Sequence, residues 1–369
     1  MSDLHYWVGF NIVRGIGPTR LRALLDYFGD IERAWHASSV ELRSAGLDRR
    51  SLESLLAARA ALDLGQELER VRAAGAHVLT WETPVYPRLL REIHDPPPVL
   101  YVKGTITEED AWAVAVVGTR RASTYGREVA RQLVTTLARS GITVVSGMAR
   151  GIDGEAHRAA LKAGGRTIAV LGCGIDRVYP PEYRKLAGEI AARGALVSDY
   201  PLGTEPEGRN FPPRNRIISG LSLGVLVVEA GVRSGALITA DYAAEQGRDV
   251  FAVPGSILMR GSAGTNALIQ DGAKVVLCPE DILEELNLTM VAEQAEARQV
   301  LPADETEAAL LAHLSAEPTH VDDLRQQMAL PIAEVTSTLA LMELKGMVRQ
   351  VGGMKYIVAR EPGVEYVVD

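Results

Sequence analysis

The chain has 369 residues, of which 47% are hydrophobic and 23% are charged, and its formal net charge is −8. This balance excludes a disordered chain, and the length predicts about two or three domains. No apolar run reaches the roughly 18 to 20 residues that a membrane helix needs, and the N-terminus lacks the basic start and apolar core of a signal peptide. We therefore expect a soluble, cytoplasmic protein with no membrane partner.

The cysteine and histidine pattern argues against a metal or disulfide protein. Cys173 and Cys278 form no CxxC motif, and the seven histidines are scattered along the chain. Neither arrangement has the spacing of a zinc site or a disulfide framework. We expect no metal and no cofactor.

Charge is distributed unevenly along the chain. Residues 1–110 carry 13 basic and 16 acidic residues, residues 111–272 carry 19 and 14, and residues 273–369 carry 7 and 17, which gives sums of −3, +5 and −10. The acidic total argues against a nucleic-acid partner, but the middle of the chain is net basic. An anionic ligand is therefore expected there.

Residues 1–78 have the apolar spacing of short helices, interrupted by glycines, and predict a small helical domain. The segment from Ile12 to Pro18, with Gly15 and Gly17, resembles a helix-hairpin-helix or SAM-like element. Glycine amides at such a helix start can hold a DNA phosphate. A tight turn inside a small bundle is the alternative.

Residues 79–288 alternate short β-branched runs with stretches of helical length. Each run is nearly all apolar, as a strand buried on both faces should be. We therefore predict an α/β domain with a Rossmann-like, doubly wound parallel sheet. The predicted strands are 113–117, 143–146, 167–171, 195–198, 225–228, 250–253 and 274–277.

The polar stretch 289–302 is predicted to be a linker, and residues 303–369 a winged-helix domain. The predicted helices are 304–315, 321–328 with Thr319 as its cap, and 332–345, followed by a hairpin of strands 348–351 and 355–358. Glu334 and Glu343 outnumber Lys345 on the helix that would enter a DNA groove. Because duplex binding needs cations on the docking face, we expect this domain to bind protein or to regulate its neighbour.

Glycine-rich loops follow the first three long strands of the predicted sheet, at 118–123, 147–153 and 172–174. In an open parallel sheet the ligand binds at the carboxyl ends of the strands, where backbone amides and helix N-termini favour a phosphate. Neither GxGxxG nor GxxxxGK[ST] is present at these turns, so a dinucleotide or a nucleoside triphosphate is a weak expectation.

The loops contain arginines instead of those nucleotide-binding motifs. Arg120 and Arg121 lie in the first loop, and the segment 209–216 contains three more arginines and no acid. Arginine matches phosphate oxygens and stacks on bases. Phe211, between these arginines, is placed either to stack on a base of a single strand or to anchor the loop in the core.

Eight ordered motifs in the central region resemble the DprA (Smf) family of DNA-processing proteins. They are Tyr86-Pro87, DPPPVLYVKG at 95–104, VGTRRAS at 117–123, SGMARGIDGEAH at 146–157, YPPEY at 179–183, FPPRNRIISGLS at 211–222, VVEAGVRSGALITA at 227–240 and FAVPGS at 251–256. The flanking helical and winged-helix domains are similar to a three-part version of the family.

The resemblance implies a bacterial protein of natural transformation that binds and protects incoming single-stranded DNA. It also implies loading of the RecA recombinase onto DNA covered by single-strand binding protein, and a homodimer that forms through the Rossmann-like domain, without nucleotide hydrolysis. Arg120 matches a phosphate-contacting arginine of the family, and Asn215 with its two flanking arginines matches its RNR block.

The predicted single-strand interface follows from these loops and motifs. It consists of Gly118, Thr119, Arg120, Arg121, Ser123, Arg150, Arg184, Lys185, Arg209, Asn210, Phe211, Arg214, Asn215 and Arg216. Relatives often carry a basic residue where this chain has Pro181 and Gly208, and Arg184, Lys185 and Arg209 could supply the charge from shifted positions. The predicted dimer contact is Leu268, Ile269, Val275, Val276 and Leu277, which could equally be core.

An enzyme is the alternative from another class. Glu229 after an apolar strand, with the loop 254–256, could serve a nucleotide or phosphoribosyl hydrolase as acid or base and phosphate cradle. A Ser146, Asp153 and His157 triad is not expected, because no nucleophile elbow surrounds the serine. We expect Asp153 to cap a helix and His157 to pack against a neighbouring loop.

Overall fold

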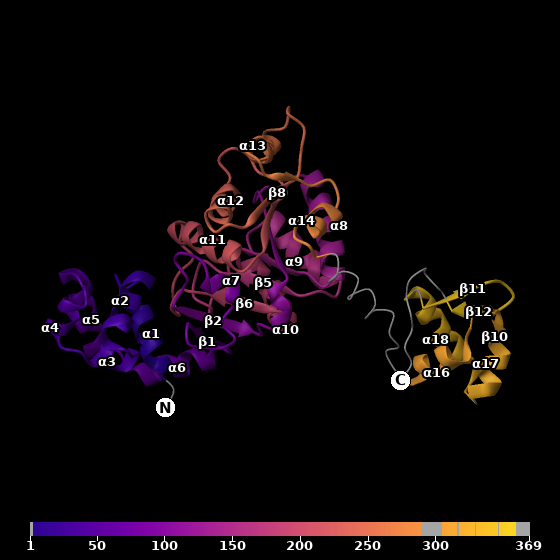
Figure 1. Cartoon of the computed structure of the whole chain (residues 1–369), viewed down its shortest axis with the longest axis horizontal. Coiled ribbons are helices and arrows are strands. Elements are labelled where there is room, and N and C mark those ends of the chain that lie inside the picture. Colours follow the sequence, from indigo (N-terminus) through magenta and orange to yellow (C-terminus); the bar gives the residue numbers. More distant parts are fainter. Residues whose placement is uncertain (1–2, 289–304, 316, 329, 346, 359–369) are drawn as a thin grey trace. The chain divides into compact units, whose positions relative to one another are not determined.

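The computed structural model describes residues 3–288, 305–315, 317–328, 330–345 and 347–358 (Figure 1). The chain divides into two compact units, Met1–Ala292 and Glu293–Asp369. The predicted linker at 289–302 lies outside the described residues. The first unit contains both the N-terminal helices and the central sheet, and a domain boundary at residue 78 within it stays a prediction.

The N-terminal helices pack around buried aromatic residues, among them Trp7, Phe10 and Trp35. The helices are α1 (Leu4–Ile12), α2 (Pro18–Phe28), α3 (Ile31–His36), α4 (Ser39–Ser44), α5 (Arg49–Ala61) and α6 (Leu64–Ala73). Between α1 and α2, Gly15 has a φ of 90°, and its carbonyl accepts hydrogen bonds from Arg20 and Ser51. These bonds tie the hairpin to the bundle, and a phosphate contact there stays a prediction.

A nine-stranded sheet forms the centre of the first unit, in the order β1-β2-β6-β5-β4-β3-β7-β8-β9. Its strands are β1 (His77–Thr80), β2 (Val99–Gly104), β3 (Ala113–Val117), β4 (Thr143–Ser146), β5 (Thr167–Val170), β6 (Ala195–Ser198), β7 (Gly224–Val227), β8 (Asp249–Ala252) and β9 (Lys274–Val275). Strands β3 to β9 pair in parallel, whereas β2 joins β1 and β6 antiparallel. Strand order reverses direction at β3 and β7, which are hydrogen-bonded neighbours.

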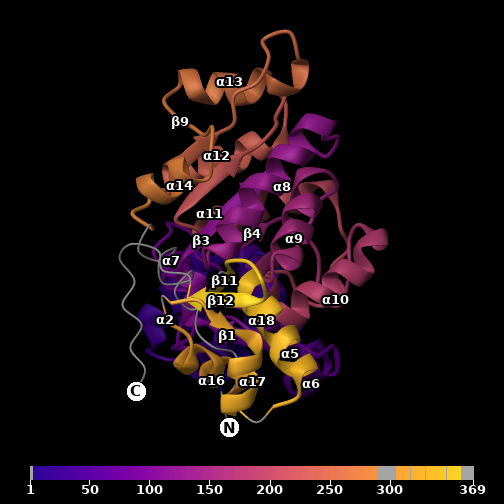
Figure 2. The ribbon, with the colours of Figure 1, turned by 90° about the vertical axis from the view of Figure 1, so that its right-hand side faces the viewer.

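Helices cover both faces of this sheet (Figure 2). Helices α8 and α9 pack with α14 on one face, and α11 and α12 pack on the other. The helices are α7 (Arg88–Arg91), α8 (Thr124–Arg139), α9 (Ile152–Lys162), α10 (Arg184–Arg193), α11 (Phe211–Gly220), α12 (Gly235–Glu245), α13 (Ala263–Gln270) and α14 (Glu280–Glu285). Short 3-10 helices are η1 (Glu108–Ala111), η2 (Pro181–Tyr183), η3 (Gly208–Asn210) and η4 (Arg260–Ser262).

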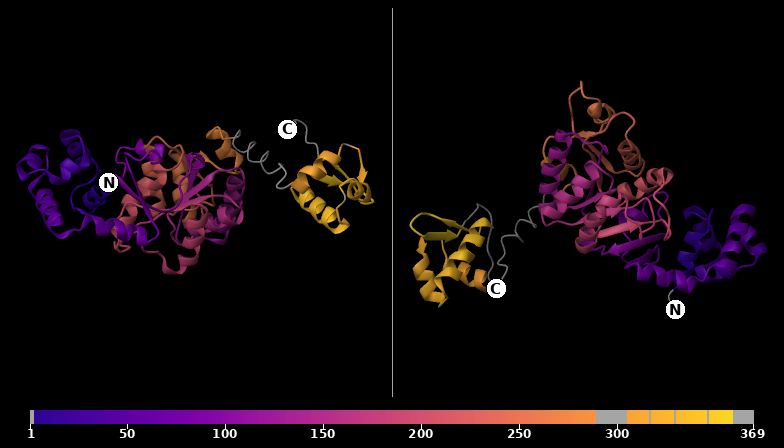
Figure 3. Two further views of the ribbon diagram at one scale, coloured as in Figure 1. Left: turned by 90° about the horizontal axis from the view of Figure 1, so that it is seen from below. Right: turned by 180° about the vertical axis from the view of Figure 1, so that it is seen from behind.

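The predicted fold class is therefore confirmed: a Rossmann-like sheet with helices on both faces (Figure 3). All seven predicted strands are present within one to two residues of their expected ends. Strands β1 and β2 were not predicted. They extend the sheet at the edge that α1 contacts, and the buried Tyr101 of β2 shares a hydrophobic cluster with the N-terminal helices.

The second unit is a winged helix. It contains α16 (Glu305–His313), β10 (Thr319–His320), α17 (Val321–Met328), α18 (Ile332–Leu344), β11 (Val348–Gln350) and β12 (Lys355–Val358). Leu310, Leu324, Val335 and Leu339 form its core. The predicted cap at Thr319 is wrong, because this residue pairs with Tyr356 in a third strand that the sequence did not indicate.

Candidate nucleic-acid interface

A cleft of about 670 Å³ opens at the carboxyl ends of β3 and β7. Its walls come from the loop after β3, the start of α9, helix α11, the loop after β7, the start of α12 and η4. This is the point at which the strand order reverses, so the chain leaves β3 and β7 in opposite directions and the loops part. We call it the switch-point cleft, and ligands of open α/β sheets bind at this position.

Close backbone packing shapes the floor of the cleft. The Thr119 amide donates to the Glu229 carbonyl at 2.7 Å, and the Ile152 amide donates to the Thr119 carbonyl at 3.3 Å. A Cβ on Gly118 would lie 2.5 Å from Cγ1 of Ile152, so only glycine fits there. The loop after β3 is thereby held against the start of α9, whose N-terminal end favours an anion.

Four exposed arginines line the switch-point cleft: Arg120, Arg121, Arg233 and Arg260. Within the part of the chain that the structure describes, no acidic side chain forms an ion pair with any of them. Arg120 lies 5.2 Å from the centroid of the Phe211 ring. Four cations without acidic partners are available to a polyanion and lose no existing ion pair on binding it.

Arg214 lies beneath the cleft and is 3% exposed. Its Nη1 donates to the carbonyl of Gly147, at 2.7 Å, and to that of Val170, at the ends of two neighbouring strands. Burial lowers the pKa of Arg214 to about 10, against the opposing effect of Asp153, so the guanidinium stays protonated at neutral pH. It therefore adds a fixed positive charge below the site without being free to follow a strand.

The Phe211 ring is half-buried and forms a wall of the cleft. It packs against Tyr179, with ring centroids 5.7 Å apart, and a Cβ on Gly172 would lie 2.7 Å from its Cδ1. Arg120 and Arg214 both lie near the ring, and a second, smaller cleft with Ala149, Arg150 and Tyr179 adjoins it. The two predicted roles of Phe211 are thus compatible, since the ring is anchored by packing and still borders both clefts.

Comparison with known proteins agrees with this architecture. The family model described as DNA recombination-mediator protein A matches residues 77–287, and that of the DprA winged helix domain matches residues 294–354. The chain belongs to the DprA (Smf) family. Protein Smf of Synechocystis sp. is 38% identical over 96% of this chain and 98% of its own length, and DNA processing protein DprA of Bacillus subtilis is 43% identical over 68% and 88%.

Two solved DprA structures are also similar. The X-ray structure of DprA from Streptococcus pneumoniae has a TM-score of 0.69 at 35% identity, covering 77% of this chain and 99% of that one. The structure of DprA from Helicobacter pylori has a TM-score of 0.52 at 30% identity, covering 58% and 97%. That second structure is described as revealing a single-stranded DNA binding mode of the Helicobacter protein.

The switch-point cleft brings together about half of the predicted interface of this DprA-family chain. Lining it are Gly118, Thr119, Arg120, Arg121, Phe211, Arg214 and Asn215. Arg150 lines the smaller cleft instead. Ser123, Arg184, Lys185, Arg209, Asn210 and Arg216 line neither.

Several of the predicted basic residues that do not line the switch-point cleft already have acidic partners. Arg150 pairs with Glu182 at 2.5 Å, Lys185 with Glu189 at 3.8 Å and Arg209 with Glu207 at 2.8 Å. Arg216 is 12% exposed and pairs with Asp199 and Asp95. Ser123 caps α8 by accepting from the Gly126 amide, which makes it a scaffold residue of the loop.

Arg233 and Arg260 were not among the predicted residues. Arg233 follows Glu229 in the VVEAGVRSG motif, so its place after an apolar strand was a usable signal. Arg260 lies eight residues beyond β8, and only the fold brings it to the cleft. Gly208 also lines the cleft, as do Arg233 and Arg260.

Glu229, the residue of the hydrolase alternative, is 9% exposed and is not among the residues that line the cleft. Its Oε2 accepts from the amide and from the hydroxyl of Ser123, both at 2.9 Å. A Cβ on Gly126 would lie 2.0 Å from the same oxygen. This carboxylate holds the start of α8 in place, which is a structural role.

Ser146, Asp153 and His157, which were not expected to form a catalytic triad, have separate partners. The Ser146 hydroxyl donates to the Val116 carbonyl at 2.6 Å, and His157 Nδ1 contacts the Thr167 hydroxyl at 2.7 Å. Asp153 lies in the first turn of α9 and accepts from the Ala149 amide at 3.2 Å. It is not the N-cap, which is Gly151, but it does bond the backbone at the helix start.

The predicted dimer residues differ in exposure. Val276 is 2% exposed and belongs to the core, so it cannot form a surface contact. Leu277 is 78% exposed, whereas Leu268, Ile269 and Val275 are partly buried.

Among the described residues, no helix has both the length and the apolar character needed to span a bilayer, and no three metal-binding side chains cluster together.

Proposed function

We propose that this chain binds single-stranded DNA in the switch-point cleft and protects it during natural transformation. The observation that carries the proposal is the set of four cleft arginines without acidic partners, Arg120, Arg121, Arg233 and Arg260, around a half-buried aromatic ring. Cations that follow the backbone beside an aromatic face are the usual means of binding a single strand. Sequence preference is expected to be slight, because phosphates carry no base information.

Fluorescence anisotropy with labelled oligo-dT tests this proposal. We expect the wild type to bind the single strand more tightly than a duplex of the same length, and the double variant Arg233→Ala, Arg260→Ala to bind it at least about tenfold more weakly at low salt. Arg49→Ala combined with Arg72→Ala, which removes two exposed arginines that pair with Glu53 and Glu69, is the charge-matched control and should bind normally. Equal affinity of the double variant and the control would refute the proposal.

We also propose that the chain delivers the bound strand to RecA and displaces single-strand binding protein from it. Membership of the DprA family supports this step. In a RecA filament assay on coated single-stranded DNA, the wild type should shorten the lag before filament growth, and the double cleft variant should not. A normal lag reduction by a variant that no longer binds DNA would separate the two activities and refute the coupling.

A homodimer is proposed at the β9 edge of the sheet. An edge strand with unpaired backbone groups and an exposed Leu277 supports such a contact. Leu277→Asp should convert a dimer into a monomer in light-scattering measurements. A wild-type chain that is monomeric at micromolar concentration would contradict this.

The winged helix is proposed to bind protein. The exposed residues of α18 include Ile332, Glu334 and Leu341, and Lys345 at its end pairs with Glu307 at 2.6 Å. Within the described part of α18, no free cation faces outward. Deletion of residues 303–369 should therefore leave single-strand affinity within about twofold, and loss of binding would show that the assignment is wrong.

A further inference from the structure

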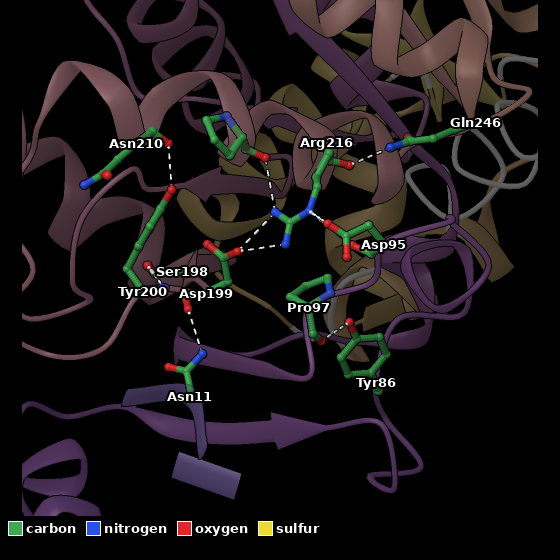
Figure 4. Close-up of polar contacts among 11 residues, drawn as sticks. Asn11, Tyr86, Asp95, Pro97, Ser198, Asp199, Tyr200, Asn210, Arg216 and Gln246 are labelled. Carbon is green, nitrogen blue, oxygen red and sulfur yellow. Dashed lines mark hydrogen bonds and ion pairs between the residues drawn. The ribbon is translucent and has the colours of Figure 1, made fainter. Parts of the chain in front are cut away.

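Arg216 does not line the cleft and belongs to a network of polar contacts (Figure 4). Its Nη1 and Nη2 donate to Oδ2 of Asp199 at 3.1 and 3.0 Å, and its Nε donates to the Asp95 carbonyl at 3.1 Å. Burial acts to lower the pKa of Arg216, but Asp199 and Asp95 outweigh it and raise the pKa. This guanidinium is engaged on several sides and is not free to contact a strand.

The segment after β6 holds α11 at two points. Asp199 binds Arg216 in the middle of the helix, and the Tyr200 hydroxyl donates to the Asn210 carbonyl at 3.0 Å, immediately before the helix begins. Phe211 and Arg214, which shape the cleft, lie between these two points. The position of the cleft wall thus depends on residues 199 and 200, which do not line the cleft.

The N-terminal helices reach the same segment through Asn11 of α1. The Asn11 Nδ2 donates to the backbone carbonyl of Asp199 at 3.2 Å (Figure 4). The Asn11 Oδ1 accepts from the hydroxyl of the buried Tyr101 at 2.9 Å. Tyr101 fixes the Asn11 amide, and the Asn11 amide fixes Asp199. A continuous hydrogen-bonded path therefore runs from α1 to α11 over residues far apart in sequence.

We propose that Asp199 is a positioning residue for the DNA site, and that Asn11 couples the N-terminal helices to α11 through it. This inference rests on the proposed single-strand function. Asp199 orients Arg216, and Arg216 orients the helix that presents Phe211 and Arg214. The N-terminal helices then support DNA affinity without touching DNA.

Electrostatics and positioning predict opposite changes in DNA affinity for one substitution, Asp199→Asn. Asp199→Asn removes a negative charge from the unit that binds a polyanion, so Coulomb forces alone would strengthen DNA binding. Loss of the Arg216 ion pair releases α11, so positioning predicts weaker binding, by about tenfold. The direction of the change therefore discriminates between the two effects.

The test is oligo-dT binding to the full-length chain at several salt concentrations, with the wild type, Asp199→Asn, Arg216→Gln and Asn11→Ala. Glu128→Gln, which removes one exposed acid on α8, is the charge-matched control. We expect weaker binding by the first three variants and unchanged or slightly tighter binding by the control. Arg216→Gln should keep the wild-type salt slope, whereas loss of a phosphate contact would lower that slope by about 0.7.

Hydrogen exchange provides the readout that does not depend on affinity. Faster exchange of amides 209–220 in Asp199→Asn, with unchanged exchange in β3 and β4, is expected for a released α11. Unchanged or tighter DNA binding by Asp199→Asn, or a reduced salt slope in Arg216→Gln, would overturn the inference. A wild type that does not bind single strands would instead refute the proposed function, so the two failures are distinct.

Discussion

Replacement of Glu229 distinguishes a scaffold carboxylate from a catalytic one. Glu229→Ala removes two hydrogen bonds at 2.9 Å, from the amide and the hydroxyl of Ser123, at a site that is 9% exposed. Bonds to a charged group contribute about 1.5–3 kcal/mol each, and the hydroxyl can find water, so we expect a loss of about 3 kcal/mol. Glu229→Gln keeps one acceptor oxygen and should cost about 1 kcal/mol.

Differential scanning fluorimetry and oligo-dT binding measure this prediction. About 3 kcal/mol corresponds to a fall in Tm of roughly 6 °C for a unit of this size. Because Ser123 caps α8 and ends the Arg120 loop, single-strand binding should weaken in parallel with stability. A normal Tm in Glu229→Ala would refute the scaffold role. Release of product from nucleoside monophosphates by the wild type, abolished in Glu229→Gln, would instead support the hydrolase alternative.

Two further substitutions test the packing of Phe211 beside the cleft and the stability of the chain in acid. In Gly172→Ala the new Cβ would lie 2.7 Å from Phe211, so the ring must move and oligo-dT binding should weaken several-fold. Gly188→Ala on α10, where a Cβ meets nothing within 4 Å, is the control and should bind normally. Equal binding by these two variants would contradict the prediction. His157 has its pKa lowered to about 3 by burial, whereas about 6.5 is expected when the chain is unfolded. The unfolded chain therefore binds more protons between these values, so stability should fall with decreasing pH below about 6.5, by up to about 1.4 kcal/mol per pH unit. His157→Gln should flatten this acid limb in urea titrations, and an unchanged limb would refute it.

Strands β3 to β7 could be predicted because each is a largely apolar run buried on both faces, whereas β8 and β9 each begin at an exposed charged residue. Strands β1 and β2 were missed because they precede the regular alternation of strands and helices that predicted the parallel strands. They join the sheet through antiparallel pairs, β1 with β2 and β2 with β6, which that alternation does not indicate. In the second unit, Thr319 is a residue type that often caps helices, but its pairing with Tyr356 places it in a strand.

At the site, the sequence shows where cations are but not what they pair with. Arg120, Arg214 and Arg216 look alike as residues flanking a sheet edge. The fold gives them three different environments: Arg120 is exposed at the cleft, Arg214 is bonded to strand carbonyls beneath it, and Arg216 is paired with Asp199. Which arginine meets an acid depends on loops that only the folded sheet brings together, and the same is true of Arg260.

The acidic total of −8 is compatible with this account, because charges act over about a Debye length, roughly 8 to 10 Å at cellular salt. The acidic excess lies outside residues 111–272, which contain the four cleft arginines and carry a net charge of +5. It also predicts that duplex DNA is repelled by most of the remaining surface.

The salt dependence of single-strand binding by Arg120→Ala tests the central claim most directly. If Arg120 contacts a phosphate, the slope of log K against log salt should fall by about 0.7 and affinity by about fivefold at about 0.1 M salt, with no difference near 1 M. Arg120 lacks an ion pair among the described residues, so its loss should leave Tm nearly unchanged. An unchanged slope and affinity would contradict a DNA site in the switch-point cleft.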